Sequence, residues 1–370
     1  MSKKTSYTAD TESRLQSLDF FRGFTMILLI GEFTGLFTSL VDPSLKGSVI
    51  YSIGEQLHHH SWNGLHFWDL IQPFFMFIVG VAIVYSVDNR TSKGDSYQQI
   101  RNHAIKRSFL LLLLGWMLYC IDPGHITFRF QNVLAQLAIT YIIAFFLVRK
   151  KVWIQILVSF LLLAITELIY RNFSIEGFNH PFVPNENFGT WLDMQYGGED
   201  LNGYWVAFNA IPTTAHTIWG VLAGILLKSN KSSSQKFKIL LLIGIIGIVV
   251  GYSMDSITPI IKRISTSSFV IVSGGWAFVT LAFSYWIIDI KKYRKWVIFF
   301  SVVGMNSLFI YLFAHVGGGE FVHNIIKPFS MALFGWTGEL SGQIITYLFT
   351  WGGLWYICYW MYKNRIFIKI

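Results

Sequence analysis

The fold of this chain is decided by stretches such as SSFVIVSGGWAFVTLAFSYWII (267–288), which carries no charged side chain over 22 residues. A helix needs about 20 mainly apolar residues to cross the hydrocarbon core of a bilayer. The rest of the chain has the same character, because 53% of its 370 residues are hydrophobic and only 13% are charged. In ordinary soluble domains roughly a quarter of all residues are charged. The sequence therefore predicts an integral membrane protein.

About ten apolar stretches follow one another, so we expect an all-α, polytopic membrane protein. Helices are favoured over barrel strands because the apolar runs are continuous, and because lipid offers no partners to free backbone groups. The expected spans are 18–40, 67–87, 108–122, 132–148, 152–170, 209–227, 238–253, 267–288, 296–315 and 339–361. Residues 1–370 then form a single transmembrane domain, with a polar N-terminal segment (1–17) and one long extramembrane stretch (171–208).

Basic residues predict the orientation of these spans. The N-terminal segment, the C-terminal tail and residues 88–107, 149–151, 228–238 and 289–295 together hold 22 of the 29 Lys and Arg. Lys and Arg concentrate in cytoplasmic loops. Both termini are therefore expected in the cytoplasm, with 171–208 on the opposite side. The same bias accounts for the net charge of +9, so nucleic acid is not an expected partner.

Two further features concern processing and metal binding. The N-terminal segment lacks the short apolar core of a cleavable signal peptide, so the first span is expected to act as an uncleaved insertion signal. Cys120 and Cys358 both lie in predicted spans, and their spacing indicates neither a zinc site nor a disulfide framework. We expect no metal ion.

Ionisable residues at membrane depth are costly and are therefore functional candidates. The densest group lies in LHHHSWNGLHFWDLIQPFF (57–75), where four histidines precede Asp69 at the start of the second span. A histidine beside a carboxylate is the minimal general-base arrangement, because the acid fixes the imidazole tautomer and stabilises the imidazolium. The other candidates are Asp19, Arg22, Glu32, Arg129, Glu167, His216 and His315.

Structural interpretations of the same residues remain open. The run His58–His60 is also typical of a solvated interfacial loop or an adventitious metal site, and Asp69 is favourable at a helix N-terminus without any catalytic role. Arg22 also fits the role of a cation whose long side chain reaches the membrane surface, and Trp62 fits that of an aromatic-belt residue at the membrane interface. From the residues alone, the chain is a membrane protein with a polar, His-rich site on its outer face.

Two motifs resemble those of the heparan-alpha-glucosaminide N-acetyltransferase family. RLQSLDFFRG (14–23) resembles the opening R-x-x-S-x-D-x-x-R-G motif, and HHSWNGLHFWDLIQPFFMFIVG (59–80) resembles the motif of the second helix, H-x-S-W-N-G-L followed by D-L. Weaker matches follow in order along the chain. They are RFQNVLAQLAITY (129–141), PTTAHTIWGVLAG (212–224), KRISTSSFVIVSGG (262–275) and VGMNSLFIYLFAH (303–315).

This resemblance implies a transmembrane acyltransferase that takes acetyl groups from cytosolic acetyl-CoA, its co-substrate. It would deliver them to glucosamine or another cell-envelope saccharide on the far side. His59 falls on the catalytic position, as general base or acetyl carrier, and Asp69 on its paired aspartate. Substrate contacts are expected from Trp62, Asn63, Asn306, His315 and Glu32. Contacts with the CoA phosphates are expected from Arg22, Arg129 and the basic stretch 88–107.

Alternatives remain open at this point. His58 and His60 flank His59 and leave the register of the motif ambiguous by one residue. A proton-coupled secondary transporter of a small polar solute could use Glu32 and Asp69, although the paired repeats typical of transporters are not evident. A relative that has lost catalysis would serve as a scaffold. We expect a location in a bacterial inner membrane, with lipid and a second copy of the chain in a homodimer as partners.

Overall fold

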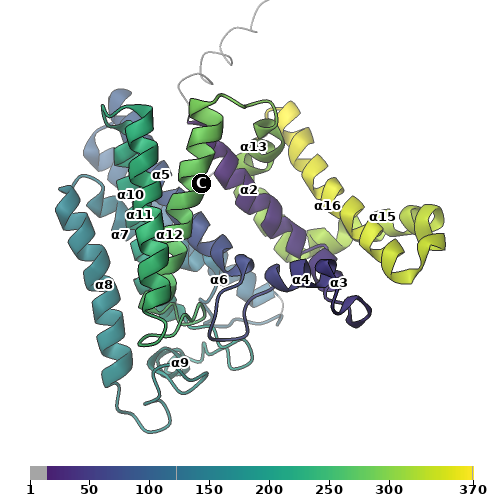
Figure 1. Cartoon of the computed structure of the whole chain (residues 1–370), viewed down its shortest axis with the longest axis horizontal. Coiled ribbons are helices and arrows are strands. Elements are labelled where there is room, and N and C mark those ends of the chain that lie inside the picture. The colour runs from purple at the N-terminus through teal and green to yellow at the C-terminus, as the bar shows by residue number, and fades with distance from the viewer. Residues whose placement is uncertain (1–14, 122, 369) are drawn as a thin grey trace, which may run out of the picture.

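The computed structural model describes residues 15–121, 123–368 and 370, and helices make up most of them (Figure 1). Within these residues no β-strand forms, and the one pairing of extended backbone is a bridge between Asn63 and Ile261. The all-α prediction is thus confirmed. The helices are α2 (Gln16–Glu32), α3 (Leu36–Leu40), α4 (Val49–Gln56), α5 (Ile71–Ser92), α6 (Tyr97–Ile121), α7 (Val133–Leu147), α8 (Val152–Asn172), α9 (Phe188–Met194), α10 (Ala210–Lys228), α11 (Ser233–Ser253), α12 (Ser267–Ser284), α13 (Val297–Met305), α14 (Ser307–Phe313), α15 (Gly319–Phe334) and α16 (Glu339–Lys363).

Six of the described helical segments are long and apolar enough to cross a membrane, which makes the protein a multi-pass membrane protein. They are Phe67–Ser92, Tyr97–Ile121, Val152–Asn172, Ala207–Lys228, Ser233–Ser253 and Ser267–Ile290. A seventh candidate is α13 with the helices after it, which bend by 71° where Asn306 interrupts them. Helices α2 and α7 have 17 and 15 residues. A total of ten spans therefore stays a prediction.

Three helices differ from the expected boundaries. The first expected span, 18–40, divides after Glu32, because Gly35 adopts a left-handed conformation (φ 84°) that starts the separate helix α3. Helix α6 begins at Tyr97, about three turns before the expected residue 108. Arg107, expected in a loop, therefore lies on a helix. Helix α15 was not predicted as a span at all, and with α16 it extends to one side of the molecule (Figure 1).

Glycines allow two pairs of central helices to approach closely. A Cβ atom at Gly80 of α5 would lie 2.0 Å from the carbonyl oxygen of Thr217 in α10, and one at Gly23 of α2 would lie 2.0 Å from that of Phe300 in α13. Small residues are favoured at helix contacts in membranes because helices there associate through van der Waals packing rather than through hydrophobic burial. These glycines therefore set the spacing of α5 with α10 and of α2 with α13.

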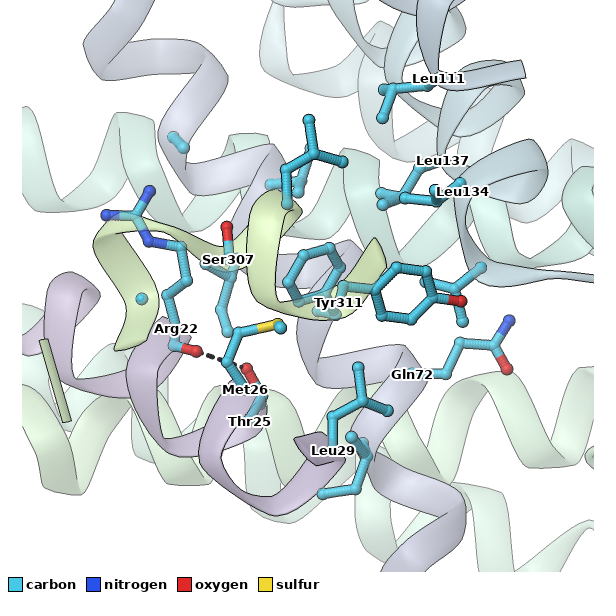
Figure 2. A pocket seen from close by; sticks show the side chains of 18 of the residues that line it. Arg22, Thr25, Met26, Leu29, Gln72, Leu111, Leu134, Leu137, Ser307 and Tyr311 are labelled. Atoms are coloured by element: carbon cyan, nitrogen blue, oxygen red, sulfur yellow. Dashed lines mark hydrogen bonds between the residues drawn. The ribbon is translucent and has the colours of Figure 1, made fainter. Parts of the chain in front are cut away.

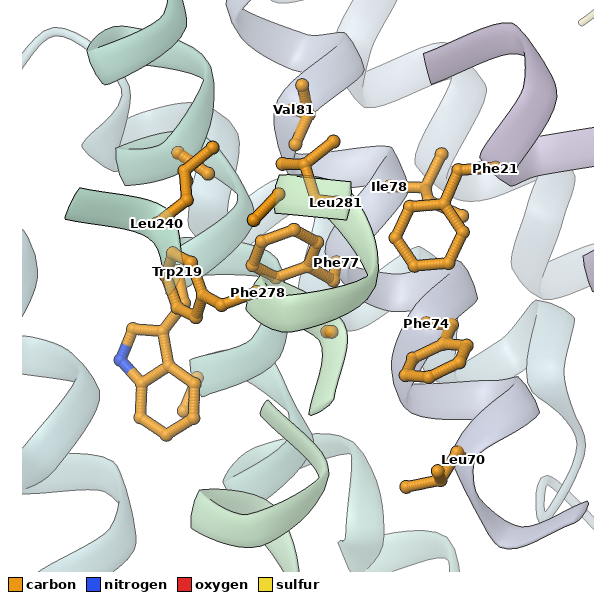
Figure 3. Packing of buried hydrophobic residues seen from close by; sticks show 14 of the residues in the cluster. Phe21, Leu70, Phe74, Phe77, Ile78, Val81, Trp219, Leu240, Phe278 and Leu281 are labelled. Atoms are coloured by element: carbon orange, nitrogen blue, oxygen red, sulfur yellow. The ribbon is translucent and has the colours of Figure 1, made fainter. Parts of the chain in front are cut away.

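Aromatic side chains tie α2 and α12 to α5. Phe21 of α2 lies edge-on to Phe74 of α5, with ring centroids 5.2 Å apart, and Phe77 of α5 lies edge-on to Phe278 of α12 at 4.9 Å (Figure 3). All four rings are buried. Such pairs contribute roughly 0.5–1.5 kcal/mol each beyond the area that they bury. Helix α2 is thus held between α5 and α13.

Loops gather at the end of the bundle where α2 ends and α12 begins. The stretch 171–208, predicted as a long extramembrane loop, contains the short helix α9, and its Phe182 carbonyl accepts a hydrogen bond from Trp62 Nε1 (2.7 Å). Gly64 N donates to Ile260 O (2.8 Å), which joins the loop before α5 to the loop before α12. Of the predicted N-terminal segment 1–17, residues 1–14 lie outside the described residues.

Candidate active site in a cavity along helix α2

A cavity of about 970 Å³ follows α2 from Gln16 to Glu32. Faces of α5, α6, α7, α13 and α14 form much of the remaining wall, together with loop and tail residues. In Figure 2, Arg22 and Met26 of α2 lie opposite Ser307 and Tyr311 of α14. A helix of this length measures about 25 Å, close to the ~30 Å of bilayer hydrocarbon. The cavity is therefore nearly as long as a membrane is thick.

The two ends of the cavity differ in chemistry. Beside the C-terminal end of α2 it is lined by aromatic and ionisable side chains, namely Glu32, His59, Trp68, Trp205, Lys262 and His315. Beside the N-terminal end it is lined by Gln16, Asp19, Arg22, Arg107 and Arg294. Between them the wall is mainly apolar, with Met26, Leu29, Phe75, Val79, Leu111 and Leu137. We call these parts the histidine end, the arginine end and the apolar middle.

His59 and Asp69 form the central pair of the histidine end. Nδ1 of His59 lies 2.8 Å from Oδ1 of Asp69. The other carboxylate oxygen, Oδ2, accepts the backbone N–H groups of His66 (2.9 Å) and His60 (3.2 Å). An ionised carboxylate only accepts hydrogen bonds, so Asp69 favours the tautomer of His59 that carries its proton on Nδ1. In that tautomer Nε2 has the lone pair, and among the described residues no group bonds it.

The local sequence explains why Asp69 meets His59. Asp69 lies three residues after His66, the residue that caps the helical turn Phe67–Leu70, and a carboxylate there accepts the free N–H of the cap. The structural interpretation of Asp69 as a helix-start residue is therefore correct, and it coexists with the contact to His59. The same hydrogen bonds hold the 1%-exposed carboxylate rigidly under the imidazole, outside the cavity lining.

The position of His59 in the cavity separates it from its neighbours. The His58 ring bonds Gly54 O (2.8 Å), the His60 ring packs against His66 with centroids 4.8 Å apart, and neither lines the cavity. In the described part of the chain, no three His, Cys, Asp or Glu side chains are placed to hold a metal ion.

Lys262 was not predicted as a site residue, yet it lies against the central pair. Its Nζ is 3.1 Å from His59 Nδ1 and 3.7 Å from Asp69 Oδ1. The bridge between Asn63 and Ile261 and the hydrogen bond from Gly64 to Ile260 bring it there. Trp205, the second residue missed, packs edge-on to the His59 ring, with centroids 5.3 Å apart.

Burial and charge shift the proton affinities of this group. Burial, together with the Lys262 ammonium, lowers the pKa of His59 to about 4, although Asp69 opposes the shift. Burial lowers the pKa of Lys262 to about 8, against the opposing effects of Asp69 and Glu32. At neutral pH the site therefore holds a neutral imidazole between a carboxylate and an ammonium group.

Glu32 and His315, both predicted at the substrate, line the cavity. Glu32 ends α2 within electrostatic reach of Lys262. The His315 ring lies on Phe33 and on Tyr311, with centroids 4.4 and 4.1 Å away, and its Nδ1 bonds Tyr311 O (3.0 Å). The structure thus brings both residues to the same cavity as His59.

Trp62 and Asn63, also predicted to contact substrate, lie behind the cavity rather than in its wall. Trp62 packs under the 171–208 stretch, and Asn63 is exposed on the bridged loop. Asn306 is buried, and its side chain binds the C-terminal tail through Ile366 O and Ile368 N, both at 3.0 Å. These three predicted contacts are not among the residues that line the cavity.

Of Arg22 and Arg129, both predicted to contact the CoA phosphates, only Arg22 lines the cavity. Arg22 lines the arginine end and pairs with Asp19 (2.7 Å). Arg129 lies outside the lining, where it pairs with Asp200 of the 171–208 stretch (2.6 Å). Arg294, a wall residue, was not predicted, whereas Arg107 belongs to the basic stretch 88–107 that was predicted to meet the CoA phosphates. Nε of Arg107 is buried, and no described residue bonds it.

Comparison with known proteins gives one family. The sequence model described as "Heparan-alpha-glucosaminide N-acetyltransferase, catalytic" matches residues 14–250, which include His59 and Asp69. Curated relatives named heparan-alpha-glucosaminide N-acetyltransferase match in mouse (30% identity over 138 residues) and in human (32% over 137 residues). Each match covers 35% of this chain and 18% of the relative, so the alignment spans less than a fifth of those proteins.

Proposed function

This chain belongs to the heparan-alpha-glucosaminide N-acetyltransferase family, and we propose that it is a transmembrane acetyltransferase. It would carry an acetyl group from cytosolic acetyl-CoA to a saccharide on the opposite side of the membrane. The observation that carries the proposal is the cavity, which is lined at one end by His59, backed by Asp69, and at the other by three arginines. The mouse and human relatives are named for transfer to a glucosaminide.

In the proposed topology ten spans cross the membrane and both termini lie in the cytoplasm. The bias of Lys and Arg supports this orientation. It places the arginine end, at the start of α2, on the cytoplasmic side, where acetyl-CoA is made. The histidine end and the 171–208 stretch then face outward. We further propose a single transmembrane domain in a bacterial inner membrane, and assembly as a homodimer is compatible with this topology.

Acetyl-CoA would bind along the length of the cavity. Its phosphates carry several negative charges, which guanidinium groups bind by charge-assisted hydrogen bonds. The buried, unbonded Nε of Arg107 supports a phosphate site at the arginine end, together with Arg22 and Arg294. The less polar pantetheine arm suits the apolar middle. This orientation would present the thioester to His59.

His59 would supply the base for acyl transfer. Its Nε2 lone pair accepts the proton of the attacking amine or hydroxyl as a bond forms to the thioester carbon. The C–S bond then breaks, and the thiolate of CoA leaves with the proton from the imidazolium. In the alternative route Nε2 attacks the thioester carbon first and the C–S bond breaks. The acetyl-imidazole then passes the acetyl group to the acceptor, whose proton goes to the released CoA thiolate. Both routes need the tautomer that Asp69 fixes.

The acceptor would bind at the histidine end. Trp68 and Trp205 present aromatic surfaces suited to the apolar faces of a sugar ring, and Glu32 and His315 offer polar contacts in the same wall. An amino sugar such as glucosamine suits this set, because its ammonium form is attracted to Glu32 and its free amine is a good nucleophile. The acidic residues of the 171–208 stretch would repel a sulfated polyanion.

A proton-coupled transporter is the second candidate function, and the length of the cavity favours it. Glu32 and Lys262, both in the wall, would be its titrating groups. Such a protein would move a small polar solute without consuming acetyl-CoA.

The experiment that separates the two functions uses purified protein in lipid nanodiscs. Acetyl-CoA consumption and acetylglucosamine formation are measured for the wild type, His59→Ala and His58→Ala. We expect turnover in the wild type, none above background in His59→Ala, and nearly unchanged turnover in His58→Ala, whose ring lies outside the cavity. Acetyl-CoA that is neither bound nor consumed by the wild type would remove the acetyltransferase proposal and favour transport.

A further inference from the structure

Lys262 is a cation buried beside the central pair of His59 and Asp69. It is 5% exposed and lies in the tight turn that leads into α12, where Ser265 N donates to Lys262 O (2.9 Å). Taking an ammonium group out of water is costly unless charges or hydrogen bonds compensate. Asp69 and Glu32 are the carboxylates that attract it. In a turn at the protein surface the Lys262 ammonium group would avoid this desolvation cost, so its burial indicates a role in the site.

The contacts of Lys262 converge on His59. Nζ lies 3.1 Å from His59 Nδ1 and 5.4 Å from the centre of the Trp205 ring, which itself packs on His59. The next residue, Arg263, turns away from the imidazole and donates to Gly203 O (2.6 Å). Only one of these two adjacent cations therefore reaches the central pair.

We propose that Lys262 is a positioning residue for acyl transfer: its ammonium group keeps His59 neutral, so that the imidazole can act as the base. This inference rests on the proposed function of His59. Lys262 does not exchange a proton with the substrate. It acts through His59 and Asp69.

The geometry supports this role in two steps. Oδ2 of Asp69 is occupied by two backbone N–H groups, so Oδ1 faces both the imidazole and the ammonium group. The ammonium group stabilises Asp69 as a carboxylate, and it is Asp69, not Lys262, that favours a proton on His59 Nδ1. A second proton on His59 would then create two adjacent cations about 3 Å apart, which is unfavourable in a buried site.

The effect of Lys262 competes with that of other groups around His59. Asp69 opposes it, and Arg263 adds a weaker effect of the same sign. The remaining titratable groups on the segments packed around His59 are Glu32, His58, His60, His66 and His315. Lys262 has the shortest contact with the imidazole of any described cation.

The test titrates His59 directly by nitrogen NMR of histidine-labelled protein in nanodiscs, with the signal assigned from His59→Gln. In the wild type we expect His59 to be mostly neutral at about pH 5, below the ordinary histidine pKa of about 6.5. In Lys262→Met and Lys262→Gln we expect at least a tenfold higher ratio of protonated to neutral His59 at that pH. Lys262→Arg, which keeps the charge, should resemble the wild type, and Arg263→Met should shift the ratio less than Lys262→Met does.

Unchanged titration in both neutral variants would overturn the proposal, as would an equal shift in Arg263→Met. The NMR readout does not need turnover, so it remains decisive if the proposed acetyltransferase activity itself is absent. Where turnover is measured, the acid limb of kcat/KM should move to higher pH in the neutral variants, in parallel with the NMR titration. A purely structural lysine would lower the yield of folded protein without moving this limb.

Discussion

Replacing Asp69 by asparagine should abolish most of the activity while leaving the fold and the cavity intact. The carboxylate accepts two backbone N–H groups through Oδ2 and faces His59 Nδ1 through Oδ1. An amide of the same size keeps its carbonyl oxygen on the backbone N–H groups. Its NH₂ group must then point at the imidazole. Because NH₂ donates, His59 is forced to carry its proton on Nε2, the atom that should react.

The size of the effect follows from this tautomer change. A positioned general base contributes about 10²–10⁴-fold to a rate, equivalent to roughly 2.7–5.4 kcal/mol of transition-state stabilisation. We expect Asp69→Asn to lower kcat by this factor. Asp69 does not line the cavity, so the KM for acetyl-CoA should change little. A stability cost of about 1.5–3 kcal/mol is expected from the lost charged hydrogen bond.

The assay compares kcat, KM and melting temperature of the wild type, Asp69→Asn and Asp193→Asn in nanodiscs. Asp193 is a matched control, because it is also fully buried and accepts a backbone N–H, that of Ala207 (2.9 Å), but lies outside the cavity lining. Its variant should lose stability and keep the kcat of the folded fraction. If Asp69→Asn kept kcat within about threefold of the wild type, the role assigned to the pair would be refuted.

Three further predictions concern pH, packing and the arginine end. The acid limb of the pH–rate profile should lie well below pH 6, because burial and Lys262 lower the pKa of His59 to about 4 and only the neutral imidazole reacts; a limb near 6.5 would contradict this. Gly80→Ala should destabilise the protein by about 1–3 kcal/mol, since its Cβ would meet α10 at 2.0 Å, whereas Gly352→Ala, with no atom within 4 Å, should be neutral in thermal unfolding. Arg107→Glu should raise the KM for acetyl-CoA at least tenfold with a smaller effect on kcat, and equal KM values in steady-state kinetics would exclude a phosphate contact.

Some of the site could be predicted because its residues are close in sequence. Only ten residues separate His59 from Asp69. A carboxylate at the third position of a helical turn is held in place by the backbone N–H of the capping residue. The apolar runs likewise predicted the all-α fold, because hydropathy acts over whole helices. Lys262 could not be found in this way. Its contact with His59 depends on a bridge between loops about 200 residues apart.

Other residues were predicted as site residues, but in the structure they contact different partners. Asn306 was predicted to contact substrate within a continuous span 296–315, but it interrupts the helix there, and its amide bonds the backbone of a tail 60 residues away. Arg129 is neutralised by Asp200, a pairing that no local pattern indicates. Long-range ion pairs and tail contacts depend on how helices pack, so hydropathy and motif spacing do not reveal them.

The central claim is transfer through the cavity, from the arginine end to His59. It is tested by reconstituting the protein in proteoliposomes with glucosamine trapped inside, and adding labelled acetyl-CoA outside to vesicles sorted for one orientation. We predict labelled acetylglucosamine inside only when the arginine end faces outward, with no product in His59→Ala. Equal product in both orientations, or product that persists without His59, would contradict transfer through this cavity.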